Sequence, residues 1–318
     1  MIICIGNALV DSLEQIEEFV IDELNLNKAR MTLVDKERSN FLLQNMKNPI
    51  YEAGGSAANT AYWISQLGGK AGFIGKISED ELGKQFQSSL KDSGLNDYTV
   101  FESEDNQTGL CAIFITPDGE RTMNTYLGAG EHLSVDDLNI DAIKEAKILY
   151  MEGYLWDKPS SKSTFLSAAK INKESGGLNS ISLSDVFCVE MHRDSFISFI
   201  ADDIDYVFCN EDELNSLTLK SSTNESFKYF EENFPKVKEL ICTLGSDGAV
   251  ILKNGEKHFF EATKTKVIDK TGAGDFFAAG YLYGLQKEFS IDKSANFANK
   301  SAAHVISEIG VRPKRKFN

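Results

Sequence analysis

The run 271–275, Thr-Gly-Ala-Gly-Asp, has the residue types of an anion-binding helix start with a carboxylate beside it. The segment 276–283 that follows is small and aromatic, as is typical of a buried helix. Because Gly272 and Gly274 lack a Cβ, backbone N–H groups there can approach an anion, and the helix dipole adds to the attraction. Asp275 could take the proton of an attacking hydroxyl group, as phosphoryl transfer requires. The alternative is an ordinary helix start capped by Thr271 or Asp275.

A second glycine-containing run, 54–61, also precedes an expected helix and carries small residues and one amide in its first turn. The backbone of Gly54 and Gly55 and the side chain of Asn59 could hydrogen-bond the hydroxyl groups of a sugar. Asp11, after the first strand, could accept from a vicinal pair of hydroxyls. For Ala57 and Ala58, tight packing of helix against sheet is the simpler explanation.

Two further segments follow expected strands and carry polar residues. Asn210 and Glu213 are three residues apart and therefore lie on one side of the next helix, where they could orient water around Mg²⁺. Thr243, Gly245 and Gly248 form a glycine-containing turn suited to nucleotide phosphates. The alternatives are a solvated acidic helix start and a plain turn.

The elements that must position these residues alternate along the chain. Short apolar runs predict strands at 2–5, 148–151, 180–183, 206–209 and 239–243, and amphipathic patterns predict helices at 160–174, 193–200 and 211–217. We expect an α/β fold with a doubly wound, mainly parallel sheet flanked by helices, which binds ligands at the carboxyl ends of its strands.

Two segments depart from this pattern, because polar and apolar residues alternate at 13–20 and 99–126. The sequence Pro117-Asp118-Gly119-Glu120 predicts a turn between two strands in the second segment. Neither segment is long enough to fold alone. We therefore expect one domain over 1–318, with a small β-sheet lid formed by inserts at about 12–21 and 98–127.

Composition excludes several classes of function. The chain has 318 residues, 42% of them hydrophobic and 25% charged, and a formal net charge of −15, which disfavours nucleic acid as a partner. It shows no signal peptide and no apolar run long enough to span a membrane. Its five cysteines form no CxxC pair, which favours a reducing, cytoplasmic location. The only dense basic stretch, 312–316, is interpreted as a frayed, solvated tail without function.

Taken together, the four polar segments resemble, in the same order along the chain, the ribokinase/adenosine kinase family, also known as the PfkB-type carbohydrate kinases. The resemblance runs from Gly6 to about Gly310. The stretch from Gly54 to Gly83 resembles the first family signature, and the stretch from Asp269 to Gly280 resembles the second.

This resemblance implies a ribokinase-like fold, the substrate ATP, Mg²⁺ and a sugar or nucleoside as acceptor, in a monomer or homodimer. It implies that Asp275 is the general base. The other implied roles are an anion hole at Gly272, Ala273 and Gly274; acceptor binding by Asp11, Gly54, Gly55 and Asn59; ATP contacts from Asn210, Thr243, Gly245 and Gly248; and metal contacts from Glu213, through water, and Glu152.

The sequence departs from the family pattern at Lys270, where threonine is usual. Since Asp269 is next to the monovalent-cation loop of some relatives, the Lys270 ammonium could replace or weaken a K⁺ site, and activation by K⁺ stays open.

The segments 6–11, 31–35 and 151–157 resemble the bacterial adenosine-kinase-like branch more than ribokinase. A nucleoside base would need an apolar slot, for which Phe114, Met123 and Tyr126 are stacking candidates, whereas a free sugar could contact Arg121. A ribose- or fructose-type kinase and a non-catalytic sensor with this fold are the alternatives. No Walker A motif, complete dinucleotide fingerprint, complete nucleophile elbow or metal-ligand histidine spacing is present.

Overall fold

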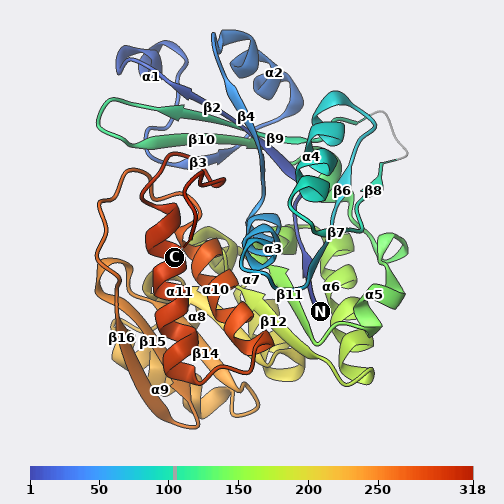
Figure 1. Cartoon of the computed structure of the whole chain (residues 1–318), viewed down its shortest axis with the longest axis vertical. Coiled ribbons are helices and arrows are strands. Elements are labelled where there is room, and N and C mark those ends of the chain that lie inside the picture. Colours follow the sequence, from blue (N-terminus) through green and yellow to red (C-terminus); the bar gives the residue numbers. More distant parts are fainter. Residues whose placement is uncertain (103–105, 318) are drawn as a thin grey trace.

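The computed structural model describes residues 1–102 and 106–317, and its large part is built around a mainly parallel sheet (Figure 1). The strands of this sheet follow one another in the order β16 (Glu256–Glu261), β15 (Gly248–Lys253), β14 (Glu239–Thr243), β13 (Tyr206–Asn210), β12 (Leu178–Ser182), β11 (Ile148–Glu152), β1 (Ile2–Ile5), β5 (Ala71–Ile74) and β7 (Asn96–Asp97). Neighbours from β7 to β14 are parallel, and the β14–β15 and β15–β16 pairs are antiparallel.

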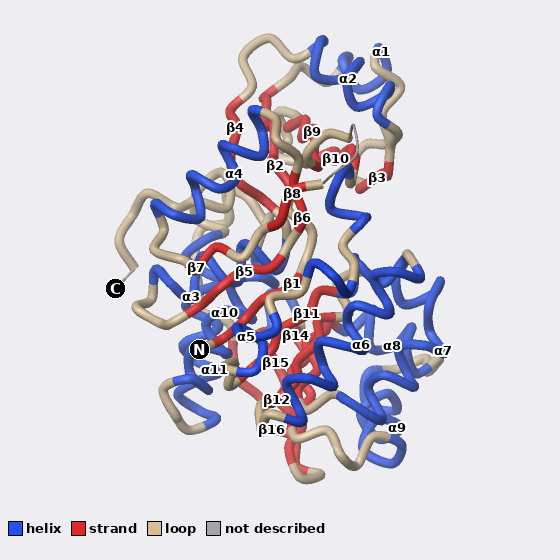
Figure 2. Tube along the Cα trace, turned by 90° about the vertical axis from the view of Figure 1, so that its right-hand side faces the viewer, coloured by secondary structure: helices blue, strands red, loops and turns tan. Residues whose placement is uncertain are grey.

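Helices cover both faces of this sheet (Figures 1 and 2). In β1, Ile2 and Cys4 face one apolar cluster and Ile3 and Ile5 face the other, because successive side chains of a strand alternate. The first cluster includes residues of α3 (Ser56–Gln66), α4 (Glu81–Asp92), α10 (Ala273–Gln286) and α11 (Ile291–Val305). The second includes residues of α5 (Ile140–Lys144), α6 (Pro159–Glu174), α7 (Val186–Asp203), α8 (Glu211–Thr218) and α9 (Thr223–Asn233). The expected doubly wound α/β fold is confirmed.

A second sheet forms the lid at the top of Figures 1 and 2. Its strands follow the order β3 (Met31–Leu33), β10 (Arg121–Tyr126), β9 (Gly109–Ile115), β2 (Leu9–Gln15) and β4 (Ile50–Gly54). The helices α1 (Phe19–Glu23) and α2 (Lys36–Asn45) belong to the same part of the chain, and β6 (Lys76–Ile77) pairs with β8 (Val100–Phe101) in a separate small sheet. The turn expected at 117–120 joins β9 to β10, with Gly119 at φ +82°.

The structure differs from the sequence-based expectations mainly at boundaries. Strands 2–5 and 239–243 agree with β1 and β14, whereas the strand expected at 180–183 begins earlier, at Leu178. The helix expected at 193–200 is part of the longer α7, which is interrupted at His192 by non-helical backbone angles. The lid also includes β3 and β4, which lie outside the two expected inserts, and residues 19–21 are helical. These additional strands are short and lack a clear alternating pattern, so periodicity alone does not reveal them.

Candidate active site

The start of α10 has the geometry of an anion site. Gly272 precedes the helix with φ +74°, and a Cβ there would lie 2.8 Å from Cγ1 of Val311, so glycine is required both by the backbone and by the available space. At Gly274 a Cβ would meet nothing within 4 Å, because this residue borders the open cleft. The first N–H groups of a helix lack intrahelical acceptors. Gly272, Ala273 and Gly274 all line the cleft at this helix start, and the backbone N of Ala273 donates to the backbone O of Lys270 at 3.3 Å, so a bound anion would compete with that hydrogen bond.

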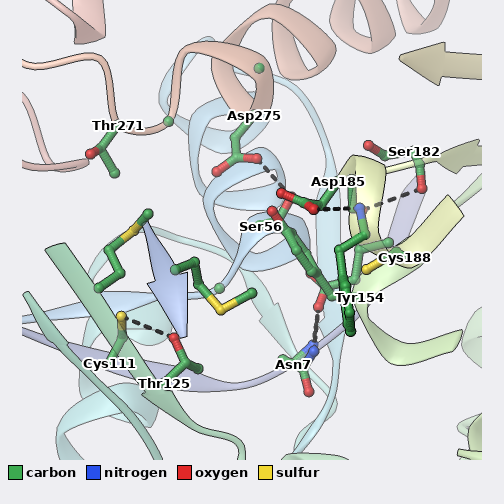
Figure 3. A pocket seen from close by; sticks show the side chains of 18 of the residues that line it. Asn7, Ser56, Cys111, Thr125, Tyr154, Ser182, Asp185, Cys188, Thr271 and Asp275 are labelled. Atoms are coloured by element: carbon green, nitrogen blue, oxygen red, sulfur yellow. Dashed lines mark hydrogen bonds between the residues drawn. The ribbon is translucent and has the colours of Figure 1, made fainter. Parts of the chain in front are cut away.

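Asp275 is held at this helix start by two side chains of α3. Oγ of Ser56 donates to Oδ1 of Asp275 at 2.7 Å (Figure 3), and Nδ2 of Asn59 donates to Oδ2 of Asp275 at 3.0 Å. Burial raises the pKa of the Asp275 carboxyl group, and the two hydrogen bonds and the charge of Arg312 act in the opposite direction. Each carboxylate oxygen thus has one protein donor and retains accepting capacity for a ligand hydroxyl.

Arg312 corrects the interpretation of the basic tail. Its Nη1 donates to Oδ1 of Asn59 at 2.8 Å, and its guanidinium carbon lies 4.2 Å from the ring centroid of Tyr62. Lys314, Arg315 and Lys316 are exposed, as expected for a solvated tail. The backbone after α11 folds back on α3, so the first basic residue of the stretch belongs to the site and the others do not.

Asp11 lines the same cleft as Asp275, a cavity of about 1360 Å³ between the lid and the large sheet. The absence of a Cβ at Gly54 makes room for the Asp11 side chain, because a Cβ would lie 2.5 Å from its carboxylate atoms. Burial raises the pKa of Asp11 to about 7, and the Asp275 and Glu52 charges raise it as well, whereas Arg312 and Arg121 lower it. Asp11 and Asp275 therefore share one cleft.

The acceptor residues predicted around Gly55 occupy different positions. Gly55 lines the cleft, with φ +94° and no space for a Cβ beside the backbone oxygen of Asn7. Gly54 and Asn59 do not line it. Gly54 lies against Asp11, and Asn59 contacts Asp275 and Arg312. Both residues therefore lie behind the residues that border the cleft.

Asn210 and Glu213 form a reciprocal cap at the start of α8. The Glu213 carboxylate accepts from the backbone N of Asn210 at 3.0 Å and from its Nδ2 at 2.7 Å, and Oδ1 of Asn210 accepts from the backbone N of Glu213 at 2.8 Å. Burial raises the pKa of Glu213 to about 7. Both residues and Thr243 line the cleft. Since the Glu213 carboxylate is already engaged by Asn210, contact with a metal ion through water suits it better than direct ligation.

The turn after β14 contains both expected glycines, but neither lines the cleft. Gly245 is exposed and has φ +57°, with open space where a Cβ would be. Gly248 is buried, has φ +119°, and a Cβ there would collide with the backbone oxygen of Phe260. Close approach of β16 therefore explains Gly248 without a nucleotide contact.

Glu152 lies at the inner end of the cleft, at the carboxyl end of β11. Its Oε1 accepts from the backbone N and the Nδ2 of Asn7, at 2.7 and 2.8 Å, and its Oε2 accepts from the backbone N of Ala57 at 2.7 Å. Burial raises its pKa to about 7. These contacts link the β1–β2 connection to the start of α3, so the carboxylate has protein donors where a metal contact was predicted.

The lid residues predicted to stack on a base have different environments. Met123 and Ile113 line the cleft. Cys111 and Thr125 line it as well (Figure 3). Phe114 does not: it is fully buried in a cluster with Leu24, Leu42 and Met46 on the other face of the lid sheet. This prediction was wrong because strand parity points Phe114 away from the cleft.

Two other lid residues are also absent from the cleft wall. The hydroxyl of Tyr126 donates to Oδ1 of Asn106 at 2.6 Å, and the Arg121 guanidinium pairs with Asp269 of the large domain. The stacking role of Tyr126 and the sugar contact of Arg121 are therefore not supported by this arrangement.

Sequence reasoning missed Ser56 and Arg312 as site residues. Ser56 had a usable signal, since it stands three residues before Asn59 and so lies on the same side of α3. For Arg312 no local pattern in the sequence indicated its position.

A glycine-containing helix start and a held aspartate beneath a β-sheet lid are the arrangement expected of a small-molecule kinase. The chain belongs to the pfkB family of carbohydrate kinases, whose family model matches residues 19–316. It is therefore an ATP-dependent carbohydrate kinase. Within the described residues, no helix is long and apolar enough to cross a membrane.

Individual relatives differ in the acceptors that their names give. The chain is 31% identical to fructokinase-1 of Zea mays over 275 residues, which cover 82% of this chain and 84% of that protein. Its structure is similar to a probable sugar kinase of Rhizobium etli, at 35% identity and a TM-score of 0.91, and to adenosine kinase of Sinorhizobium meliloti, at 33% identity and 0.91. Each structural match covers 99% of this chain and 96% of the other.

Proposed function

We propose that this kinase transfers the γ-phosphoryl group of ATP to a hydroxymethyl group of a nucleoside, with Asp275 as general base. The observation that carries the proposal is the placement of Asp275, held by Ser56 and Asn59, in the same cleft as Asp11 and the start of α10. The acceptor hydroxyl gives its proton to Asp275 while its oxygen bonds to the γ-phosphorus. The bond from that phosphorus to the β,γ-bridging oxygen breaks, and ADP leaves with the electron pair.

The backbone donors of 272–274 would stabilise negative charge on the transferring group, because preorganised N–H groups act strongly where water is excluded. Asn210 and Thr243 line the cleft and would contact ATP, with Gly245 and Gly248 shaping the turn beside it. Mg²⁺ neutralises phosphate charge when it is bound with ATP. Among the described residues no three His, Cys, Asp or Glu side chains form a metal site, and Glu213, held by Asn210, would act through water.

The lining of the lid side supports a nucleoside as acceptor. Its apolar side chains are Leu9, Leu26, Leu33, Cys111, Ile113 and Met123, and the polar residues Asn27, Lys28, Arg30, Thr32 and Thr125 are also in the lining. A nucleobase could fill such a slot, whereas a free sugar would leave it without a partner. Asp11 would hold the ribose hydroxyls. The similarity to adenosine kinase of Sinorhizobium meliloti also supports a nucleoside as acceptor.

A sugar kinase is the second candidate, supported by the 31% identity to fructokinase-1 of Zea mays. The two candidates are separated by measuring ATP consumption with Mg²⁺ across adenosine, inosine, ribose and fructose, with and without K⁺. We expect kcat/KM for a nucleoside to exceed that for either sugar by at least about tenfold. Preference for fructose or ribose would reject the nucleoside and leave the kinase class intact.

The role of Asp275 as base is tested by Asp275→Asn. The control is Asp194→Asn, because Asp194 is a fully exposed residue of α7. We expect kcat to fall by about 10²- to 10⁴-fold while calorimetric binding of the acceptor stays within a few-fold. Transfer within a few-fold of the unmodified protein would reject Asp275 as base. Absence of transfer by the unmodified protein with every acceptor would favour a binding sensor instead.

A further inference from the structure

Arg312 lies behind the catalytic aspartate. Its ring partner Tyr62 and its hydrogen-bond partner Asn59 both belong to α3, and its Nη1 also donates to the backbone O of Val311 at 2.8 Å. Its Nε and Nη2 are shut off from solvent and make no hydrogen bond to any of the described residues. Burying a guanidinium with part of its donors unused is costly. A role beyond holding the tail would account for that cost.

The Asn59 amide connects Arg312 to Asp275. A guanidinium can only donate and an ionised carboxylate can only accept, so the amide is fixed with Oδ1 toward Arg312, at 2.8 Å, and Nδ2 toward Asp275, at 3.0 Å. The reversed amide would place an oxygen against the carboxylate and an NH₂ group against the guanidinium. Arg312 therefore selects the one orientation in which Asn59 supports Asp275.

The charges around Asp275 give Arg312 a second effect. Asp275 interacts electrostatically with four groups of neighbouring elements: Asp11 of β2, Tyr150 and Glu152 of β11, and Tyr154. Each of these four groups is neutral or negative. Arg312 supplies the positive charge that lowers the pKa of Asp275 against the effect of burial.

We propose that Arg312 is a positioning residue for phosphoryl transfer, which fixes the Asn59 amide and through it the carboxylate of Asp275. The inference rests on the proposed role of Asp275 as base. Neither Arg312 nor Asn59 lines the cleft, whereas Asp275 does, so the support comes from behind and leaves the acceptor side free. A base aligned in this way needs no reorientation when the acceptor hydroxyl arrives.

The test compares Arg312→Gln with Arg312→Lys by the pH profiles of kcat and by KM for ATP. For Arg312→Gln we expect kcat at pH 7 to fall about ten- to hundredfold and the acidic limb to move up by about one pH unit, since a positive charge is lost. KM for ATP should stay within about twofold, because Arg312 does not border the cleft. Arg312→Lys, which keeps the charge, should restore the limb while only partly restoring kcat, because an ammonium lacks the planar stack on Tyr62.

The control is Arg315→Gln, at an exposed residue of the same tail, which should change neither kcat nor the limb. In an Asn59→Ala background, Arg312→Gln should lower kcat by less than about threefold, since the mediating amide is gone. An undiminished loss there, or an acidic limb unmoved in Arg312→Gln, would overturn the proposal. Failure of Asp275→Asn to lower kcat would instead reject the base, so the two failures are distinguishable. If Arg312→Gln does not fold, the pH profile of kcat for Arg312→Lys is used instead. An acidic limb of Arg312→Lys at higher pH than that of the unmodified protein contradicts the proposal.

Discussion

Arg121 of the lid strand β10 and Asp269 of the loop before α10 form a buried ion pair that joins the lid to the large domain. The same carboxylate accepts hydrogen bonds from the backbone N of Thr271 at 3.0 Å and of Gly310 at 2.8 Å. One side chain therefore connects the lid, the loop before α10 and the segment that carries Arg312. Closure of the lid and order in that loop should depend on each other.

The first prediction concerns this ion pair. Arg121→Gln should favour the open lid, because it leaves Asp269 buried without its charged partner. Acceptor KM should rise about tenfold, since binding must then bear the cost of closure. Hydrogen exchange of the amides in β9 and β10 should become faster. The exposed pair Lys170–Glu174 offers a control, and Lys170→Gln should leave acceptor KM unchanged. Unchanged KM and exchange in Arg121→Gln would show that the pair does not hold the lid.

The second prediction separates two glycines of the anion site. Gly272→Ala should destabilise the protein by about 1–2 kcal/mol, because φ is +74° and the Cβ would press on Val311. Gly274→Ala should leave the melting temperature unchanged or raise it, since alanine stabilises a helix by up to about 1 kcal/mol relative to glycine.

The added methyl group of Gly274→Ala should nevertheless lower kcat/KM at least about tenfold by obstructing the phosphate site. Thermal unfolding and steady-state kinetics on both variants check this pair. Full activity of Gly274→Ala would place the anion site elsewhere.

The sequence predicted that Asp11, Asp275, Asn210 and Thr243 belong to one site, and all four line the cleft. Asn210 and Thr243 end the parallel strands β13 and β14, whose carboxyl ends meet at one edge of the sheet. Arg312 could not be found in this way. Its place depends on how the tail packs on α3, and a basic stretch at a chain end has the same local pattern whether it is solvated or buried.

The lid was harder to predict for a related reason. Residues 110–115 are apolar on both faces of β9, so the pattern does not show which face borders the cleft. Phe114 was chosen by residue type, and register placed it against α2, while Cys111 and Ile113 face the ligand side.

The third prediction follows from the pKa of Asp11, which burial raises to about 7. An acid whose pKa is higher in the folded than in the unfolded protein keeps its proton on folding, so stability falls as pH rises from about 4 to about 7. Asp11→Asn removes this dependence. The free energy of unfolding of Asp11→Asn, relative to that of the unmodified protein, should therefore be higher at pH 8 than at pH 5 by on the order of 2–3 kcal/mol.

Urea unfolding of both proteins at the two pH values measures this difference. Asp194→Asn, at an exposed position, serves as the control and should show no such difference. Equal effects of Asp11→Asn at pH 5 and pH 8 would contradict a raised pKa. Acceptor KM should increase in Asp11→Asn at both pH values, because the carboxyl group proposed to bind the hydroxyls is lost.

The fourth prediction concerns Lys270, the departure from the family pattern, which is exposed and lines the cleft beside the anion site. An ammonium there attracts the polyphosphate of ATP, so Lys270→Gln should raise KM for ATP about three- to tenfold at low salt. The difference should shrink in 0.5 M NaCl, because salt screens exposed charges. Lys264→Gln is the matched control, since Lys264 is exposed in the same loop but does not line the cleft. Repeating the series in KCl separates screening from activation by K⁺. If KCl raises the rate of Lys270→Gln but not that of the unmodified protein, and NaCl raises neither, the Lys270 ammonium occupies the place of the monovalent cation. A KM difference that persists at high salt would mean that Lys270 acts through shape instead of charge.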